Sequence, residues 1–174
     1  MGNLKTCIAV ATGGLAILLA ACSHPPLPPP ASDRLSPTAM VEAIRAARSD
    51  DKSVVQVAPL RDPAVDGLLD NAHADEGAGK YQDALAKIDA ALKLSPDAPD
   101  VLQFRAEVEV LLRDYAAAAA DAQHSFTLGP KVGGLCASNW QTLLEIAETK
   151  GDQAGVADAR IRRDACHKAG PVRL

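Results

Sequence analysis

Residues 65–98 read VDGLLDNAHADEGAGKYQDALAKIDAALKLSPDA, and residues 99–132 read PDVLQFRAEVEVLLRDYAAAAADAQHSFTLGPKV. Each stretch has the apolar periodicity of two helices on either side of a polar corner. Identical residues recur at a spacing of 34: Leu68 and Leu102, Ala72 and Ala106, Tyr81 and Tyr115, Ala84 and Ala118, Leu94 and Leu128, and Pro96 and Pro130. Such a period predicts a repeat array, in which each short unit buries its apolar face against the next.

A third and weaker copy follows the first two. Trp140, Leu143 and the corner Gly151-Asp152 fall 72 residues after the matching positions of the first unit, so the junction before them is longer. Loss of the pattern is expected of a terminal unit, because its outer face meets water instead of another repeat. We therefore expect a repeat domain over residues 62–170, with units at 65–98, 99–132 and about 137–170.

The repeated residues resemble those of the tetratricopeptide repeat. The first helix of that repeat has a bulky residue at its fourth position and a small one at its eighth, matched here by Leu68 and Ala72. Its second helix needs a small residue, as at Ala84, and a proline ends the unit, as at Pro96. The resemblance implies an all-α solenoid of about three helical hairpins with a concave, protein-binding face. The alternative is an Ala-rich helical bundle whose spacing arises by chance.

The resemblance also predicts which residues line the concave face. The corresponding first-helix positions are Asp66, Leu69, His73, Glu76, Asp100, Gln103, Glu107, Val110, Leu111, Gln141, Glu145 and Glu148. This set is acidic with an apolar strip, so we expect it to bind a basic or mixed basic and apolar segment of another protein. Val110 and Leu111 are the expected apolar contact, and Glu107 and Glu145 the expected charge partners. The alternative is that these carboxylates form a solvated helix face.

The first 21 residues are typical of a secretory signal peptide, because one charge, Lys5, precedes an uncharged run rich in Ala, Leu and Ile. The sequence Leu19-Ala20-Ala21-Cys22 resembles a bacterial lipobox, which implies a mature chain beginning at a lipid-bearing Cys22. Ser23 stands where the enteric pattern uses an aspartate to retain lipoproteins at the inner membrane. The resemblance therefore favours anchoring in the outer membrane with the domain in the periplasm. An uncleaved signal anchor is the alternative.

Residues 22–61 are expected to contain the lipidated cysteine, a tether and a short helix. The Pro-rich run 24–30 predicts an extended, stiff spacer. Ser36-Pro37 predicts the start of a helix that continues to about Ser49. Met40, Val41, Ile44 and Ala47 share one face of this helix, which we expect to cap the first repeat. Residues 54–57, Val-Val-Gln-Val, predict a short extended linker.

The charge and the cysteines limit the kinds of partner. The net charge is −4 and basic residues gather at 160–174, so the rest of the chain is acidic and nucleic acid is not an expected partner. Residue 151, the corner of the third hairpin, is the midpoint between Cys136 and Cys166, so antiparallel helices would bring the two cysteines level. An oxidising periplasm then favours a disulfide, unless helix axes 8 to 10 Å apart hold the sulfurs out of reach. With His167 the cysteines supply three ligands, fewer than a structural zinc site needs, so no metal is expected.

The sequence carries no recognised catalytic motif: it has no GxSxG, HExxH, GK[ST] loop or CxxC. We therefore expect no catalytic residue and no cofactor, although convergence of His73 and Glu107 in a closed pocket would favour an enzyme. The favoured function is an outer-membrane-anchored, periplasmic scaffold that binds another envelope protein during complex assembly. A pilotin-like or secretion and pilus accessory lipoprotein is the alternative, and a small periplasmic enzyme is the third class.

Overall fold

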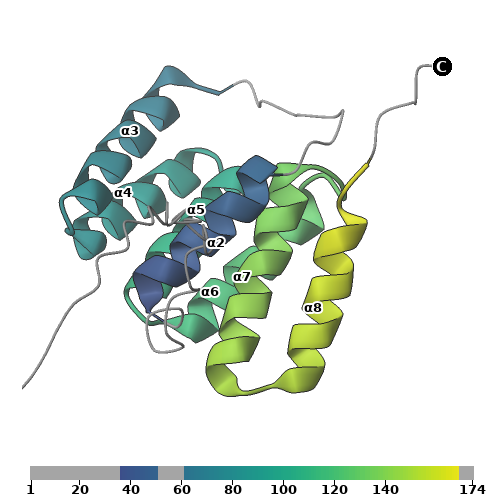
Figure 1. Ribbon diagram of the computed structural model, residues 1–174. Coiled ribbons are helices and arrows are strands. Elements are labelled where there is room, and N and C mark those ends of the chain that lie inside the picture. Colours follow the sequence, from purple (N-terminus) through teal and green to yellow (C-terminus); the bar gives the residue numbers. More distant parts are fainter. Residues whose placement is uncertain (1–35, 51–60, 169–174) are drawn as a thin grey trace, which may run out of the picture.

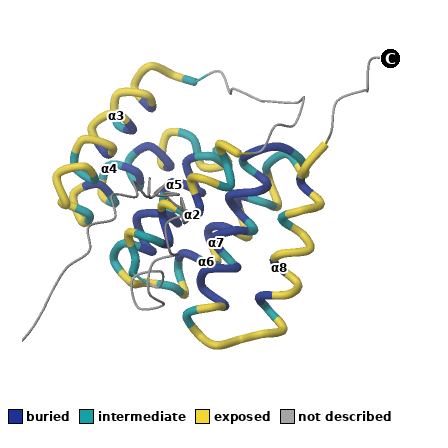
Figure 2. The backbone as a smooth tube through the Cα atoms, in the orientation of Figure 1, coloured by how far each residue is buried: buried dark blue, intermediate teal, exposed yellow. Residues whose placement is uncertain are grey.

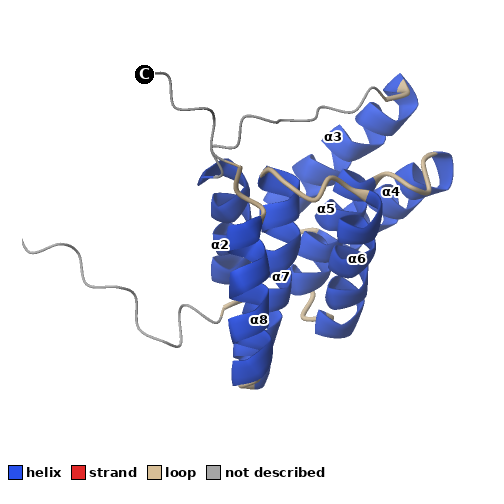
Figure 3. Cartoon of the chain, turned by 90° about the vertical axis from the view of Figure 1, so that its right-hand side faces the viewer, coloured by secondary structure: helices blue, strands red, loops and turns tan. Residues whose placement is uncertain are grey.

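The structure, a computed structural model, describes residues 36–50 and 61–168. Figure 3 shows helices and loops, and no strand, among these residues. The helices are α2 (Pro37–Asp50), α3 (Pro63–Gly77), α4 (Tyr81–Leu94), α5 (Pro99–Leu111), α6 (Tyr115–Leu128), α7 (Gly134–Lys150) and α8 (Gln153–Ala165). The predicted signal peptide, the lipid-bearing Cys22, the Pro-rich tether and the extended linker at 54–57 lie outside the described residues.

Six of the helices form three successive hairpins (Figure 1). Helix α3 packs on α4, α5 on α6, and α7 on α8, while contacts of α4 with α5 and of α6 with α7 join each hairpin to the next. The longer junction predicted before the third unit is the segment between Leu128 and Gly134. The prediction of an all-α solenoid of three helical hairpins is confirmed.

The three hairpins turn in the same way. Gly79, Arg113 and Gly151 follow the first helices and have positive φ angles of 73°, 64° and 69°. In each turn the next residue donates its backbone N–H to the carbonyl oxygen five residues earlier, over 2.8 Å from Lys80, 2.9 Å from Asp114 and 2.9 Å from Asp152. This is the Schellman pattern, in which a left-handed residue satisfies the last carbonyls of a helix. The repeat is therefore preserved in backbone geometry even where residue types differ.

Arg113 is the position where this shared turn is strained. A side chain with a Cβ is disfavoured in the left-handed region, whereas glycine adopts it readily. We expect Arg113→Gly to raise the free energy of unfolding by about 0.5 to 1 kcal/mol, measured by urea denaturation. The reverse change, Gly79→Arg, should lower it by a similar amount, because an added Cβ there meets open space and only the backbone angle is strained. A loss of stability in Arg113→Gly would contradict this account.

The buried residues, dark blue in Figure 2, include two large apolar cores and a smaller cluster around Cys136 and Cys166. The first lies within α3, α4 and α5, where Val65, Ile88 and Val108 are fully buried. The second contains Ala106 and Val110 of α5 and Ile146 of α7. Its remaining large side chains are contributed by a helix outside the hairpins, namely α2. The second and third hairpins are thus packed together partly through α2.

Helix α2 begins as the sequence predicts, because the Ser36 hydroxyl accepts a hydrogen bond of 3.2 Å from the backbone N–H of Ala39. The side chains of Met40, Val41 and Ile44 are buried, also as predicted. Its location differs from the prediction: α2 packs on α7 and α5, not as a cap on the first hairpin. The physical reason is that α3 closes its apolar face within its own core, whereas Val110 and Ile146 offer an apolar surface that matches α2.

The predicted disulfide between Cys136 and Cys166 is present, with Cα atoms 5.6 Å apart. Cys136 lies in the first turn of α7 and Cys166 directly follows α8, so the bond closes the open end of the third hairpin. Both cysteines are buried, and Phe126 and Trp140 pack beside them with ring centroids 5.0 Å apart. The terminal hairpin is therefore held at one end by its turn and at the other by a covalent bond.

Candidate protein-binding groove

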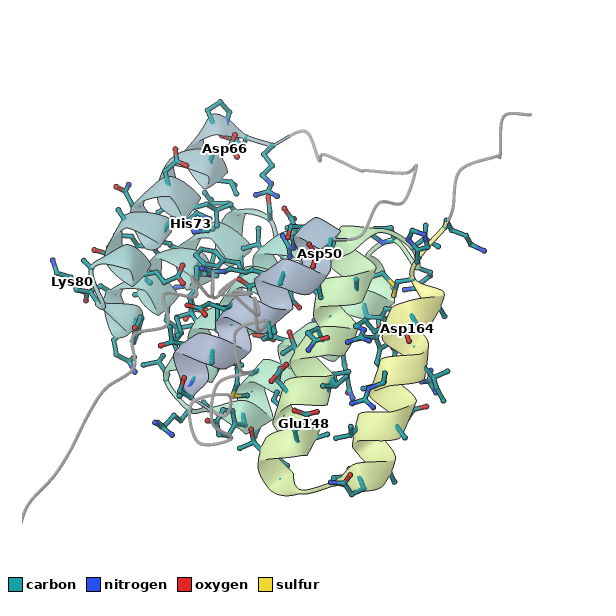
Figure 4. All side chains as sticks on the ribbon, viewed as in Figure 1. Asp50, Asp66, His73, Lys80, Glu148 and Asp164 are labelled. Atoms are coloured by element: carbon teal, nitrogen blue, oxygen red, sulfur yellow. A yellow bond between two sulfur atoms is a disulfide. The ribbon has the colours of Figure 1, made fainter. Side chains whose placement is uncertain are left out.

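The first helices of the three hairpins, α3, α5 and α7, line one face of the domain, and α2 lies on this face (Figure 1). Figure 4 places His73 and Asp66 on α3 at one side of α2, and Glu148 on α7 and Asp164 on α8 at the other. We call this face the groove; it consists of the concave-face residues predicted from the sequence. In the structure the groove holds a helix of the same chain.

The predicted groove residues fall into two groups. Those beneath or beside α2 and within the first core are buried: Leu69, Gln103, Glu107, Val110, Gln141 and Glu145. The others are partly or fully exposed: Asp66, His73, Glu76, Asp100, Leu111 and Glu148. The alternative of a merely solvated acidic face is therefore wrong for Glu107 and Glu145, which are 4% and 6% exposed.

Two arginines of α2 hold the acidic part of the groove. Arg45 Nε donates to Glu107 Oε2 over 2.8 Å, and its terminal nitrogen donates to Glu76 Oε1 over 2.7 Å. Arg48 lies 3.9 Å from Glu107 Oε1 and donates to the Ser138 hydroxyl over 3.3 Å. Burial alone would raise the pKa of Glu76, but hydrogen bonds from His73 and Arg45 together with their charges lower it. These charge-assisted contacts fix the position of α2 along the groove.

The apolar part of α2 fills the rest of the groove. Met40 and Ile44 are completely buried and pack in one cluster with Val110 of α5 and Ile146 of α7. The Thr149 hydroxyl of α7 lies 3.7 Å from the sulfur of Met40. Burial of side chains of this size contributes roughly 1.5 to 3 kcal/mol each, more than exposed ion pairs do, so apolar contact supplies most of the attraction.

A network of hydrogen-bonded polar side chains lies under α2. Gln103 Nε2 donates to the Thr142 hydroxyl over 2.9 Å and to Glu107 Oε1 over 3.3 Å. Gln141 Nε2 donates to Glu145 Oε1 over 2.6 Å, and Arg163 of α8 donates to Gln141 Oε1 over 2.8 Å. Glu145, predicted as a charge partner for a ligand, is thus held by residues of its own hairpin. Glu107 and Glu76 are the groove carboxylates that pair with Arg45 of α2.

Glu145 is buried without a direct cationic partner, and this shifts its titration. Burial raises the pKa of Glu145 to about 7, despite the hydrogen bond from Gln141, and the charge of Glu148 adds to the rise. The folded state therefore binds the proton more tightly than the unfolded chain, whose ordinary pKa is 4.5. Consequently the free energy of unfolding should fall as pH rises from about 4.5 to about 7 and remain lower above it.

Glu145→Gln should remove the part of this dependence on pH that Glu145 contributes and leave the part that Glu109 contributes. The amide keeps the shape and the hydrogen-bonding capacity of a protonated carboxyl, so we expect the variant to be about 2 kcal/mol more stable than wild type at pH 8 and equal to it at pH 4.5. Urea denaturation of both proteins across this range measures the difference. Glu42→Gln, the same substitution at an exposed position of α2, is the matched control. Parallel curves for wild type and Glu145→Gln would show that Glu145 titrates normally.

Two openings remain beside α2. The first, of about 290 Å³, lies between α2 and α3, and its walls include Arg45, His73, Phe104 and Glu107. The imidazole of His73 stacks on Phe104 with ring centroids 4.0 Å apart. The second opening, of about 460 Å³, lies between α2 and α8 and is lined by Ala43, Ala46, Ala47, Asp50, Ala137, Gln141, Arg163, Asp164 and His167. Helix α2 thus divides the groove lengthwise and leaves space along each of its sides.

His73 and Glu107, the pair whose convergence in a closed pocket would favour an enzyme, line the same opening. Glu107 is bound by Arg45 and Gln103, while His73 Nδ1 lies 3.7 Å from Glu76 and its ring stacks on Phe104. Both groups are therefore engaged in contacts that hold the helices together. Within residues 36–50 and 61–168, no cluster of three His, Cys, Asp or Glu side chains is arranged to hold a metal.

A second charged cluster joins the hairpins. Arg105 of α5 donates to Asp121 of α6 over 2.7 Å and to Asp89 of α4 over 3.1 Å. Burial and the charge of Asp121 together raise the pKa of the neighbouring Glu109 to about 8, although the charge of Arg105 opposes the rise. This cluster was not predicted from the sequence, although Asp89 and Asp121 lie at the same separation, 16 residues, on either side of Arg105. Its contacts bridge three helices, so its role in the described fold is structural.

The pairing of Arg45 and Arg48 with the groove was also not predicted from the sequence. The signal was present, because a helix with an apolar face and two arginines has the chemistry predicted for a groove ligand.

In the part of the chain that the structure describes, no helix is both long enough and apolar enough to span a membrane.

Comparison with known proteins gives one structural relative. No family model matches this sequence, and no curated protein matches it either. Among solved structures, a domain with 28% sequence identity and a TM-score of 0.57 covers 60% of this chain. It is the globular C-terminal domain of P. aeruginosa LpoP. The match includes 99% of the LpoP domain, so this chain contains a counterpart of almost all of it.

Proposed function

We propose that this protein is a lipid-anchored interaction module of the bacterial envelope, and that its tetratricopeptide-like domain binds a segment of another envelope protein. The observation that carries the proposal is the occupied groove. Its apolar strip and Glu107 together hold a basic amphipathic helix, so this face has the shape and charge to bind such a helix.

Two further observations support a location in the envelope. The buried disulfide between Cys136 and Cys166 is suited to an oxidising compartment such as the periplasm. The relative, LpoP, is represented by a C-terminal domain, and here too the hairpins follow an N-terminal segment with the features of a signal peptide, lipobox and tether. We propose the same order of parts for this chain: an acyl anchor at Cys22 in the outer membrane, a spacer, and a domain that reaches into the periplasm.

The partner is proposed to contribute a basic and apolar segment, because the carboxylates of the groove would repel an acidic one. Chemical crosslinking in intact cells, followed by purification of the lipidated protein and mass spectrometry, tests this. An enriched envelope protein that crosslinks to the helices lining the groove is the expected result. Enrichment of a secretion or pilus channel protein would favour the accessory role instead. Recovery of no envelope protein above background would contradict the proposed function.

The anchor is tested separately by changing Cys22. We expect wild type to fractionate with the outer membrane and to begin at an acylated Cys22, because multiple acyl chains give stable anchoring. Cys22→Ala should be recovered unprocessed or released from the membrane, while Cys7→Ala, within the predicted signal peptide, should behave as wild type. Detection of an intact Met1 N-terminus in the functional, membrane-bound protein would show that the lipobox interpretation is wrong.

A further inference from the structure

Helix α2 carries the apolar and basic side chains that the groove residues are expected to bind. Its buried side chains, Met40, Val41 and Ile44, meet the apolar strip, and Arg45 pairs with Glu107. This is the basic and apolar combination expected of a partner from the groove residues alone. The helix belongs to none of the three hairpins, since it packs on the first helices of the second and third hairpins from outside.

We propose that α2 is an internal ligand of the groove, and that a partner helix with the same pattern of apolar residues and arginines replaces it. The inference rests on the proposed function and specifies how the same site is used. Counted from its first apolar residue, the pattern has apolar residues at positions 1, 2 and 5 and arginines at positions 6 and 9. In α2 these are Met40, Val41, Ile44, Arg45 and Arg48.

Exchange requires that α2 be removable without loss of the hairpins. Each hairpin has its own apolar contacts and a complete turn, and the third also has its disulfide. The two arginines of α2 are 43% and 40% exposed, so water can solvate them as their ion pairs break. The openings on both sides of α2 give an incoming helix access to the groove beside it.

Competition with α2 also sets the apparent affinity for the partner. Because α2 is part of the same chain, it competes at an effective concentration on the order of millimolar. If α2 leaves the groove free for only a small fraction of the time, the apparent dissociation constant of the partner equals its intrinsic value divided by that fraction. A change in α2 that weakens its own docking should therefore strengthen binding of an external helix.

The test uses the full mature chain and a labelled synthetic peptide with the sequence of residues 36–50, SPTAMVEAIRAARSD. In the protein, Arg45→Glu places a carboxylate of α2 against Glu76 and Glu107 and leaves the groove itself unchanged. We expect the peptide to bind Arg45→Glu at least about tenfold more tightly than wild type. Arg160→Glu, the same substitution at an exposed position of α8, should bind the peptide as wild type does.

Gly134 supplies a check that the peptide occupies the position of α2. A Cβ added at Gly134 would lie 2.5 Å from the backbone oxygen of Arg48, so any helix placed as α2 is would collide with it. Adding Gly134→Ala to Arg45→Glu should remove the gain in affinity. Gly67→Ala, at a helical glycine with open space around its added Cβ, should leave the gain intact.

Hydrogen exchange of the same proteins measures the opening of α2 directly and does not depend on the peptide. In Arg45→Glu the amides of α2 should exchange faster than those of α5 and α7. The proposal is overturned if α2 exchanges only together with the hairpins, or if α2 opens and the peptide still fails to bind. Because this assay needs no cellular partner, its failure would leave the proposed function standing. Absence of a crosslinked envelope protein would count against the proposed function and not against this result.

Discussion

Glu107→Lys is expected to weaken the docking of α2 in the groove and to lower the free energy of unfolding by about 3 kcal/mol. The Glu107 carboxylate is 4% exposed and pairs with Arg45, with Arg48 nearby. A lysine there would place a third cation against two guanidinium groups in a buried site, and Glu76 would be the remaining acidic partner of Arg45. The three hairpins should keep their helical content, because the two helices of each hairpin pack on each other. Denaturation by urea and hydrogen exchange of α2 amides measure the two effects.

Glu148→Lys is the control for Glu107→Lys. It makes the same change in charge on a first helix of the same groove, but its carboxylate is 39% exposed and its partner Arg160 is 55% exposed. Ion pairs of this kind contribute roughly 0 to 1 kcal/mol, so a small loss of stability is expected. A bound basic partner segment should dissociate faster from Glu107→Lys, because loss of a buried charge pair acts on the dissociation rate and α2 competes only for the free groove. An unchanged dissociation rate in Glu107→Lys would move the binding site away from the groove.

Removal of the disulfide is expected to lower the free energy of unfolding by about 3 kcal/mol, because the bond closes a loop of 30 residues and restricts the unfolded chain. The double substitution of Cys136 and Cys166 by alanine tests this, with urea denaturation as the readout. The loss should fall on the third hairpin, whose open end the bond closes, and the amides of α8 should show it in hydrogen exchange.

Reduction of the wild-type protein provides the control for that experiment. The reduced protein and the double variant should have nearly the same stability if the covalent bond supplies the effect. Equal stability of the oxidised protein and the double variant would contradict the prediction. Non-reducing peptide mapping of protein purified from the periplasm should recover the two cysteines as one crosslinked peptide pair.

Local sequence determined the helical hairpins and their turns. Prolines at repeat ends, small residues at helix contacts and corner residues at 79, 113 and 151 act within a few residues of chain, so their effect is visible without a folded structure. The disulfide was predictable for a related reason. Two cysteines equidistant from the turn of an antiparallel hairpin must come level, whatever the rest of the domain does.

Tertiary structure alone decided what the groove contains. The sequence showed that Met40, Val41 and Ile44 share the apolar face of a short helix, and it placed Glu107 and Val110 on the concave face of the repeats. Periodicity identifies the face of a helix that must be buried, but it does not identify the surface that buries it. That choice depends on which exposed apolar surface of the folded hairpins matches α2 in shape and charge. Among the described residues, the assembled second and third hairpins present such a surface, with the strip around Val110 and Ile146 beside the carboxylate of Glu107.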